Sequence, residues 1–468
     1  MDRSTGNTHN VSKEQNTPGI ERCRFRPYPQ YKDFGVEWLG KIPAHWDITR
    51  TKEQFCIVNG STPSSSEPSF WDGDIVWVTP DDLGELHESR LGDSSRKITE
   101  EGYKSCGTSI VPKGSILVST RAPIGYVAIA TTNLCTNQGC KSLVPKRLLN
   151  NGFFYYQLSS AKCELESRGQ GSTFRELSRD KLGQIILARP PEPEQHAIAS
   201  FLDRETAKID ALVEKKERLI ELLQEKRAAL ITQAVTRGLD PTVPMKDSGV
   251  EWLGEIPTHW ALVPLKSITL ARPGSIKTGP FGSQLLASDM AQEEIKVYNQ
   301  RNVIAHDFTA GENYISMSKF RELASFEVFK NDILVTTRGT IGKSAIVPNG
   351  AERGILHPCL LRIQPDSDKI KIAYLALIIQ ESNLVINQLA LASNATTIDV
   401  IYSDTIGRVL IPCPPINEQS AIFEFLDGMT VKIDALMSKI REAITSLREY
   451  RAALISAAVT GKIDVREG

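Results

Sequence analysis

Hydrophobic residues recur with helical spacing over two long stretches of the chain. Alternate steps of four and three residues from Ile422 meet an apolar side chain every time, at Ile422, Leu426, Met429, Ile433, Leu436, Ile440, Ala443, Leu447, Tyr450 and Leu454. The corresponding positions from Ile198 to Leu230 are apolar at seven of ten steps. This spacing is typical of a coiled-coil seam. We predict two helices of about 40 residues, each about 60 Å long.

The ends of both helices carry recognisable signals. Pro193 and Pro415 precede the two periodic stretches, and Asn417 is a candidate N-cap. Gly238 and Gly461 follow the last periodic residues, where glycine commonly ends a helix.

The rest of the chain alternates short strand patterns with shorter helical patterns. Segments rich in β-branched residues and bounded by Gly or Pro predict strands at 74–79, 115–120, 126–130 and 184–188. Helical patterns cover 151–167 and 371–390. These regions are therefore expected to be mixed α/β domains.

The chain contains an internal repeat. Asp33–Trp46 (DFGVEWLGKIPAHW) and Asp247–Trp260 (DSGVEWLGEIPTHW) are identical at eleven of fourteen positions. Each long helix begins after a Pro-Pro and a Glu-Gln pair and ends in RAALI followed by AVT. The segments between the repeated motifs differ much more, although Ser115–Ala130 matches Asp332–Val347. Two copies of one packing domain explain the repeated motifs, whereas two different recognition tasks also explain the divergent interiors.

The repeat gives a domain plan. We expect a polar, disordered extension at 1–30, a first domain at 31–192, a central helix at 193–238, a second domain at 239–415, and a distal helix with its tail at 416–468. Because the second copy begins where the first helix ends, the helices should pack antiparallel. The expected fold class is α/β, with two mixed α/β domains joined by two long antiparallel coiled-coil helices in a pseudo-two-fold repeat.

Composition restricts the cellular setting. The chain is 41% hydrophobic and 24% charged, and no apolar run approaches the roughly 20 residues of a membrane span. No secretion signal is evident, so we expect a cytoplasmic protein. Its eight cysteines lack a C-x-x-C pair, which favours free thiols. The net charge of -1 is low for a nucleic-acid-binding protein, so basic residues would have to be local or partners would have to share phosphate contacts.

Polar loops in the divergent interiors supply candidate nucleic-acid contacts. Hydroxyl, amide and basic side chains can reach phosphates and base edges, although the same composition suits any solvated loop. The candidate DNA-binding residues are Thr62, Ser64, Thr79, Arg121, Lys141, Ser275, Lys277, Asn302 and Arg338. Arg121 and Arg338 recur at one position of the repeat, as either a shared structural pairing or a shared phosphate contact.

Catalytic and cofactor motifs are not evident in the sequence. GTIGKS at 339–344 resembles the end of a phosphate-binding loop, but Thr337 stands where that loop needs its first glycine. His45 and His259 lie beside tryptophans of the repeated motif, which favours structural hydrogen bonds. We predict no catalytic, cofactor-binding or metal-binding residues in this chain.

The repeated V-E-W-L-G-x-I-P-x-H-W motif, the P-P-x-x-E-Q-x-A-I-x-x-F-L-D helix starts and the R-A-A-L-I helix ends resemble specificity subunits of type I restriction-modification systems. The resemblance extends from about Tyr31 to Asp464 and implies two target-recognition domains that read a bipartite double-stranded DNA site. It also implies two adenine-N6 methyltransferase subunits using S-adenosylmethionine, and restriction and translocase subunits using ATP and Mg.

The resemblance places the methyltransferase dock on the long helices. The helix residues expected at the partner or coiled-coil interface are Glu194, Gln195, Ile209, Leu212, Leu219, Leu223, Glu418, Gln419, Ile433, Leu436, Ile440 and Leu447.

Two other classes of function stay open on sequence grounds. An autonomous DNA-modifying enzyme would need the N/D-P-P-Y/F-type catalytic tetrapeptide and a glycine-rich methyl-donor loop, and the chain has neither. A coiled-coil scaffold that binds no DNA would not require divergent interiors.

Overall fold

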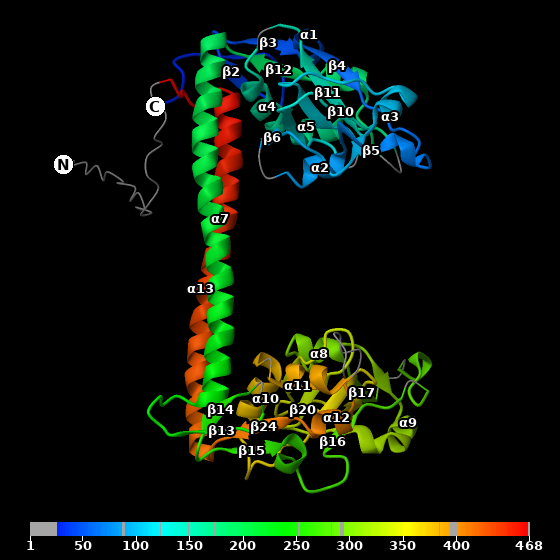
Figure 1. The fold of residues 1–468 in the computed structure, drawn as a ribbon, viewed down its shortest axis with the longest axis vertical. Helices are drawn as coiled ribbons and strands as arrows, with labels where there is room; N and C mark the ends of the chain where they lie inside the picture. The colour runs from blue at the N-terminus through cyan, green and yellow to red at the C-terminus, as the bar shows by residue number, and fades with distance from the viewer. Residues whose placement is uncertain are drawn as a thin grey trace, which may run out of the picture. The chain divides into compact units, whose positions relative to one another are not determined.

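The computed structural model describes residues 26–86, 89–121, 123–147, 149–171, 175–250, 253–281, 283–290, 294–382, 384–393 and 401–466. Most of the polar extension expected at 1–30 therefore lies outside the described residues. The chain divides into two compact units. Unit 1 comprises Met1–Lys215 and Ala443–Gly468, and unit 2 comprises Lys216–Glu442. Each unit holds one α/β domain, called domain 1 or domain 2, and part of each long helix (Figure 1).

Domain 1 is built around a five-stranded sheet in the order β4-β11-β8-β9-β6. Its strands are β4 (Phe55–Asn59), β11 (Cys140–Pro145), β8 (Ile116–Ser119), β9 (Val127–Ala130) and β6 (Arg90–Leu91). A second sheet has the order β10-β5-β7, from β10 (Cys135–Thr136), β5 (Trp71–Val78) and β7 (Lys97–Ile98). The pairs β1 (Tyr31–Asp33) with β2 (Lys41–Pro43) and β3 (Asp47–Arg50) with β12 (Ile186–Arg189) complete the domain.

The helices of domain 1 are short. They are α1 (Thr51–Gln54), α2 (Pro80–Gly84), α3 (Glu100–Ser105), α4 (Asn151–Ser160), α5 (Lys162–Ser167) and α6 (Arg179–Gly183). Phe153 and Phe154 of α4 are fully buried in the main hydrophobic core of unit 1, which explains the strongly apolar sequence of that helix.

Domain 2 has the same central arrangement. A four-stranded sheet has the order β16-β23-β20-β21, from β16 (Ile276–Thr278), β23 (Leu360–Ile363), β20 (Ile333–Thr336) and β21 (Ser344–Ile346). The second sheet, β18-β17-β22-β19, contains β18 (Tyr314–Ile315), β17 (Ile295–Tyr298), β22 (Gly354–Leu356) and β19 (Glu327–Val328). The remaining pairs are β13 (Met245–Asp247) with β14 (Glu255–Pro257) and β15 (Ala261–Pro264) with β24 (Leu410–Cys413).

Domain 2 has five α-helices within the described residues. They are α8 (Gln300–Ile304), α9 (Met317–Glu322), α10 (Ile372–Glu381), α11 (Leu384–Ser393) and α12 (Ser403–Gly407). Three antiparallel pairings recur in the central sheets: β4-β11-β8-β9 of domain 1 corresponds to β16-β23-β20-β21 of domain 2. The sequence repeat is thus a repeat of topology.

The predicted strands and short helices are found close to the expected places. The strands expected at 74–79, 115–120, 126–130 and 184–188 correspond to β5, β8, β9 and β12. Each of the two helical patterns, however, forms a pair of helices: α4 and α5 meet at Ala161, and α10 ends before Ser382. Periodicity alone does not reveal such breaks, because the apolar face continues across them.

The two long helices are confirmed. Helix α7 (Glu192–Arg237) has 46 residues and α13 (Ile416–Val459) has 44. Gly238 and Gly461 follow them with φ angles of 76° and 69°, the left-handed conformation that ends a helix. The predicted starts were slightly wrong, because α7 begins before Pro193 and Asn417 lies inside the first turn of α13. Proline fits the first turn, where no backbone donor is needed.

The helices pack antiparallel in both units. In unit 1, Ile198 and Ile209 from the first half of α7 share a hydrophobic core with Leu454 and Ala458 from the end of α13. In unit 2, the end of α7 shares a core with the start of α13, through Ile231, Ala234, Ile422 and Leu426. Each domain core therefore includes residues from both long helices.

The predicted seam is wrong at several steps, where the predicted residue is exposed and the next residue along the helix is buried or half-buried. One run of buried or half-buried positions in α7 keeps the spacing of a seam: Leu202, Thr206, Ile209, Val213, Lys216, Ile220, Leu223, Arg227, Leu230 and Ala234. The expected residues Leu212 and Leu219 lie one position earlier and are 44% and 43% exposed. In α13, Met437 is buried while Leu436 is 45% exposed, and Ile444 is buried while Ala443 is half-buried. The pattern was ambiguous because apolar residues occupy both of these adjacent positions.

The observed seam includes arginines that are paired with aspartates of the opposite helix. Arg451 Nε lies 2.9 Å from Asp210 Oδ1 in unit 1, and Arg227 Nε lies 3.3 Å from Asp434 Oδ1 in unit 2. Both arginines begin the repeated RAALI motif and both aspartates belong to the repeated KIDAL motif. Each repeat thus contributes one arginine and one aspartate, and the two ion pairs fix the helix register.

Candidate functional site

The repeated His-Trp motif is joined to the start of each long helix. His45 Nε2 lies 2.9 Å from Glu194 Oε2 in unit 1, and His259 Nε2 lies 2.8 Å from Glu418 Oε2 in unit 2. Trp260 Nε1 also donates to Glu418 at 3.1 Å. The histidines therefore have the structural hydrogen bonds that the sequence favoured.

The glutamines beside these glutamates lie inside the protein. Gln195 Nε2 donates to the Pro190 carbonyl and Gln419 Nε2 to the Pro414 carbonyl, both at 2.9 Å. Glu194, Gln195 and Gln419 are buried and Glu418 is half-buried. These four residues were expected at the partner or coiled-coil interface, and their observed contacts hold the repeated motifs against the helix starts.

The loop at residues 61–69 of domain 1 is held by two indole groups. Trp77 Nε1 donates to the Ser61 carbonyl at 2.9 Å, and Trp71 Nε1 donates to the Ser64 carbonyl at 3.1 Å. The Ser64 hydroxyl is exposed, and Thr62 donates to the side chain of Gln138. Two candidate residues, Thr62 and Ser64, therefore lie on a loop with a fixed conformation, which lowers the entropy cost of binding.

An arginine that the sequence analysis missed lies beside this loop. The guanidinium carbon of Arg96 is 3.6 Å from the centroid of the Trp71 ring. Arg96 is exposed, and its guanidinium has no hydrogen-bond or ion-pair partner among the described residues. Because the guanidinium of Arg96 stacks on the Trp71 ring by its flat face, its N–H donors at the edge stay available to a ligand. The sequence offered no signal for this contact, since it depends on how β5 and β7 pair.

Arg121 and Lys141 share one carboxylate. Arg121 Nε lies 3.1 Å from Glu176 Oε2, and Lys141 Nζ lies 3.5 Å from Glu176 Oε1 and 3.1 Å from Thr120 Oγ1. Burial lowers the pKa of Lys141, while Glu176 opposes that shift. Arg121 thus has the structural pairing considered above, and the pair is partly neutralised within domain 1.

Thr79 caps helix α2. Its hydroxyl donates to Asp82 Oδ2 at 2.7 Å, and the Asp82 amide donates to Thr79 Oγ1 at 3.4 Å. Burial alone would raise the pKa of Asp82, but hydrogen bonds from Ser95 and Thr79 hold it below its usual value. Thr79 is therefore a helix cap first, and its half-buried side chain has little freedom to contact a ligand.

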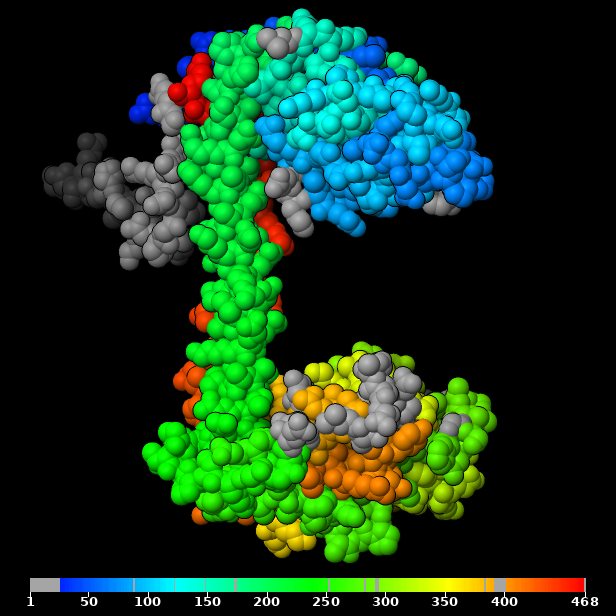
Figure 2. Space-filling model, in the orientation of Figure 1, coloured from blue at the N-terminus to red at the C-terminus, as the bar shows by residue number. Residues whose placement is uncertain are grey.

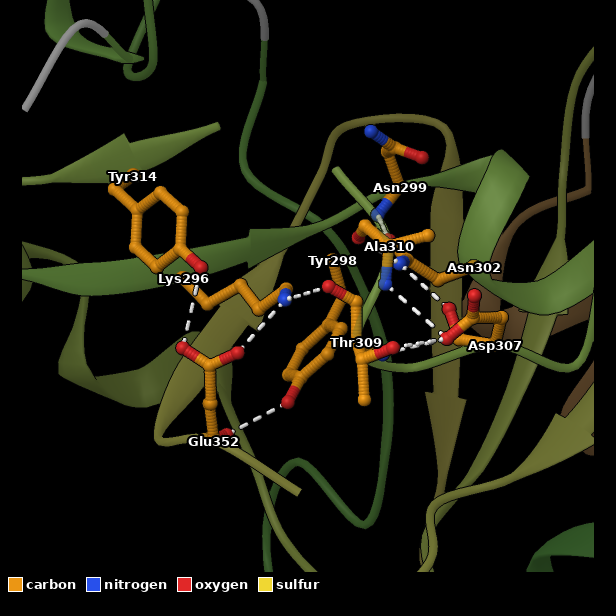
Figure 3. A network of polar contacts seen from close by, with 9 residues as sticks. All are labelled: Lys296, Tyr298, Asn299, Asn302, Asp307, Thr309, Ala310, Tyr314 and Glu352. Atoms are coloured by element: carbon orange, nitrogen blue, oxygen red, sulfur yellow. Dashed lines mark hydrogen bonds and ion pairs between the residues drawn. The ribbon is translucent and has the colours of Figure 1, made fainter. Parts of the chain in front are cut away.

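Asn302 lies inside a polar network of domain 2 (Figure 3). Its amide nitrogen donates to the carbonyls of Asp307 at 2.9 Å and Ala310 at 2.7 Å, and its oxygen accepts from the Asn299 amide at 2.9 Å. The side chain is buried. Any contact between Asn302 and DNA would require these bonds to break.

The same figure shows a buried lysine, Lys296, that was not among the candidate DNA-binding residues. Lys296 Nζ donates to Glu352 Oε1 and to the Thr309 carbonyl, both at 2.9 Å (Figure 3). Tyr314 donates to the other oxygen of Glu352 at 3.2 Å. Every polar group of this cluster has a partner, so we assign it to the fold of domain 2.

Lys277 and Arg338 line one cavity of about 500 Å³ in domain 2. Ser275, by contrast, is held in the adjoining turn, where its carbonyl accepts from the Gln364 amide at 2.8 Å. The cavity is also lined by Phe281 and Tyr402, which are 75% and 54% exposed. The structure thus brings together two of the four domain 2 candidates and adds two aromatic residues that the sequence analysis did not select.

The long helices present apolar side chains to solvent. Leu212, Leu219 and Leu436, which were expected in the seam, are exposed, as are Leu222, Val431 and Tyr450. We call these six residues the exposed helix face. Ile209, Ile433 and Ile440 are buried as expected, and Leu223 and Leu447 are half-buried. A strip of α7 is visible at the surface in Figure 2.

No described helix is long and apolar enough to cross a membrane. No group of three or more His, Cys, Asp or Glu side chains in the described ranges is arranged to hold a metal ion.

The family model for the type I restriction modification DNA specificity domain matches residues 43–222 and 288–446. Among similar proteins, the MjaIX specificity subunit of Methanocaldococcus jannaschii is 37% identical over 43% of this chain and 46% of its own length. The EcoBI specificity subunit of Escherichia coli is 24% identical over 70% of this chain and 69% of its own length. The chain spans about half the length of the first two curated relatives it matches.

Solved structures give the same fold. A chain from a structure of the assembly and conformational transition of the type I R-M system superposes with a TM-score of 0.63 at 17% identity, covering 89% of this chain and 98% of that one. The HsdS subunit from Thermoanaerobacter tengcongensis superposes with a TM-score of 0.51 at 17% identity, covering 92% and 100%.

Proposed function

We propose, because the chain belongs to the family of type I restriction-modification DNA specificity domains, that it reads a two-part DNA target with one domain for each part. The observation that carries this proposal is the duplication. The family model matches both copies, and both copies have the same central sheet. The loops differ: domain 1 has the serine-rich loop 61–69, whereas domain 2 has the aromatic-lined cavity. Two similar scaffolds with different loops suit two different DNA sequences.

The two domains should read an asymmetric target with a spacer of fixed length. Duplex DNA has local two-fold symmetry, so a duplicated reader can meet two half-sites in the same way. Unlike loops give unlike half-sites. The spacer would be set by α7 and α13, since each domain core includes residues of both helices.

The chemistry would be supplied by partner subunits. On this proposal the chain is a non-catalytic subunit that directs two adenine-N6 methyltransferase subunits, and restriction and translocase subunits join them. The partners would use S-adenosylmethionine, ATP and Mg. Because the chain has a net charge of -1, they would also contribute phosphate contacts.

The exposed helix face is the proposed dock for the methyltransferase. Solvent-exposed leucines on a long helix are costly in a free protein and mark interaction surfaces. Leu212 belongs to unit 1 and Leu219, Leu222 and Leu436 to unit 2, so each unit offers apolar residues to a partner.

The test is reconstitution with purified subunits. The chain alone should transfer no methyl group, the methyltransferase alone should show no sequence preference, and the mixture should methylate adenine within one bipartite motif. Methyl transfer by the chain alone, or an unchanged sequence preference in the mixture, would refute the proposal. Changing Leu219 and Leu222 to serine should weaken assembly, whereas the same change at the exposed Leu286 of domain 2 should not.

A further inference from the structure

The cavity in domain 2 combines three kinds of group that bind nucleotides. It has a volume of about 500 Å³, and its lining includes Lys277, Thr278, Phe281, Arg338, Tyr402 and Asp404. Lys277 and Arg338 are cations, Phe281 and Tyr402 offer exposed rings, and Asp404 offers an acceptor. Exposed aromatic rings beside basic groups are a common way to hold bases.

The cations of the cavity differ in how they are held. Lys277 Nζ lies 4.3 Å from the centroid of the Phe326 ring, so its position is fixed by that ring. Burial lowers the pKa of Lys277, and the nearby Arg362 lowers it further. The Arg338 guanidinium is exposed and has no ion pair or hydrogen bond within the described part of the chain. Of the two cavity cations, Arg338 is therefore the one whose guanidinium has no partner among the described residues.

The duplication provides an internal comparison for Arg338. The Thr120 amide donates to the Gly139 carbonyl in domain 1, and the Thr337 amide donates to the Cys359 carbonyl in domain 2, which shows that Arg121 and Arg338 occupy equivalent positions. Arg121 is neutralised by Glu176, as described above. The following contacts are also equivalent, because the Leu177 and Ile401 amides donate to the Thr120 and Thr337 carbonyls.

The sequence is consistent with this difference between the two arginines. The residue before Leu177 is Glu176, whereas the residue before Ile401 is Val400, which carries no carboxylate and lies outside the described residues. The lysine also differs between the domains. Cys140 pairs with Ser119 in domain 1 as Leu360 pairs with Thr336 in domain 2, so the next residue is Lys141 in domain 1 and Leu361 in domain 2. Within the part of the chain that the structure describes, the repeated arginine is thus paired with a carboxylate in domain 1 and not in domain 2.

A hydroxyl group in the cavity wall is also without a partner. Thr278 Oγ1 is buried and makes no hydrogen bond in the described structure. A buried polar group without a partner is destabilising, and a ligand that supplies one removes that cost. The neighbouring Gly279 is required because a Cβ atom there would lie 2.2 Å from the His357 carbonyl oxygen, so the wall is closely packed.

We propose that this cavity is the base-reading pocket of domain 2 and that Arg338 contacts guanine in the half-site read by that domain. An arginine fork pairs with guanine O6 and N7 in the major groove, and Asp404, which lines the same cavity, would accept from the amino group of the paired cytosine. Phe281, at the rim, contacts the neighbouring base. This inference rests on the proposed function, because it names the determinant of one of the two half-sites.

The experiment uses the full chain assembled with its methyltransferase. The methylated motif is first determined by sequencing, and binding of cognate and random duplexes is then measured by fluorescence anisotropy at several salt concentrations. The variants are Arg338→Ala, Phe281→Ala and the control Arg321→Ala, which removes the same charge from an exposed residue of α9 that does not line the cavity.

Arg338→Ala should reduce cognate affinity about 5- to 150-fold, leave random affinity nearly unchanged, and make one guanine of the domain 2 half-site degenerate. Phe281→Ala should weaken cognate binding, because it removes an apolar contact with a base edge in the major groove. Arg321→Ala should match the parent. Melting curves of each variant show whether domain 2 is still folded.

Each other result overturns a different statement. Equal loss of cognate and random binding, with a salt slope smaller by about one, would make Arg338 a phosphate contact and refute base reading. An unchanged motif and affinity in both cavity variants would refute the pocket while leaving the proposed function intact. The absence of any sequence preference in the parent complex would refute the proposed function itself.

Discussion

Replacing Arg227 by methionine should destabilise unit 2 by about 2 kcal/mol at neutral pH. The Arg227 side chain is 23% exposed and pairs with Glu381, which is 25% exposed, and with Asp434 at 3.3 Å. Removing one partner of a fully buried pair costs about 3–5 kcal/mol, whereas an exposed pair contributes below about 1 kcal/mol. Because the Arg227 pair with Glu381 is about one quarter exposed, we expect an intermediate value.

The loss should also depend on pH. Burial alone would raise the pKa of Glu381, but the hydrogen bond from Arg227 holds it below its usual value of 4.5. A carboxylate with a lowered pKa stabilises the folded state above about pH 4.5, and this contribution disappears as the pH falls through the lowered value. In Arg227→Met, burial acts unopposed. The difference between parent and variant should therefore be full at pH 7 and should shrink below about pH 4.5.

Hydrogen exchange resolves the two units of the chain. Mass spectrometry of peptides from α10 and from the end of α7 should show faster exchange in Arg227→Met, and the melting temperature of unit 2 should fall by about 4–8 °C. Arg451→Met is the matched control, because Arg451 pairs with Asp210, whose side chain is 46% exposed, and should cost below about 1 kcal/mol. Equal losses in both variants, or a loss that does not change with pH, would refute this account of the ion pairs.

Three further predictions concern charge, pH and length. Glu176→Gln should free Arg121 and Lys141, so affinity for random DNA should rise in a salt-sensitive way; unchanged binding in anisotropy titrations would contradict it. Burial lowers the pKa of His357 below its usual value of 6.5, so unit 2 should lose stability as the pH falls below about 6.5, and His357→Gln should flatten that part of the melting-temperature profile. Four residues inserted after Leu223 and four after Leu447 add about 6 Å to each helix and should lengthen the spacer of the methylated motif by about two base pairs, whereas two residues rotate the helix by about 200° and should impair assembly. An active four-residue variant with an unchanged spacer would show that the helices do not set it.

The sequence identified the long helices because their signals are local. A repeated seam, a glycine at each end and a proline at each start are all read within one stretch of chain. The exact seam was wrong because Leu212 is followed by Val213, and Leu219 by Ile220, so two adjacent positions were equally apolar. The choice between them depends on the opposite helix, which places Arg227 and Arg451 in the seam by pairing them with aspartates.

The candidate site was less predictable for a related reason. Polar composition selected Asn302 and Lys277 alike. The side chain of Asn302, however, makes its hydrogen bonds within the protein, while Lys277 lines a cavity. Phe281, Tyr402 and Arg96 were missed because their importance comes from exposure and from neighbours distant in sequence. Only the equivalence of Arg121 and Arg338 was visible beforehand, and their different surroundings required the structure.

The most direct test of the central claim is a domain exchange. Residues 58–185, which form most of domain 1 between its repeated motifs, are replaced by the corresponding segment of a related specificity subunit, and the methylated motif is sequenced after assembly with the methyltransferase. We predict that one half of the motif changes to that of the donor, while the other half and the spacer stay the same. A change in both halves, or in neither half of an active complex, would contradict the assignment of one domain to each half-site.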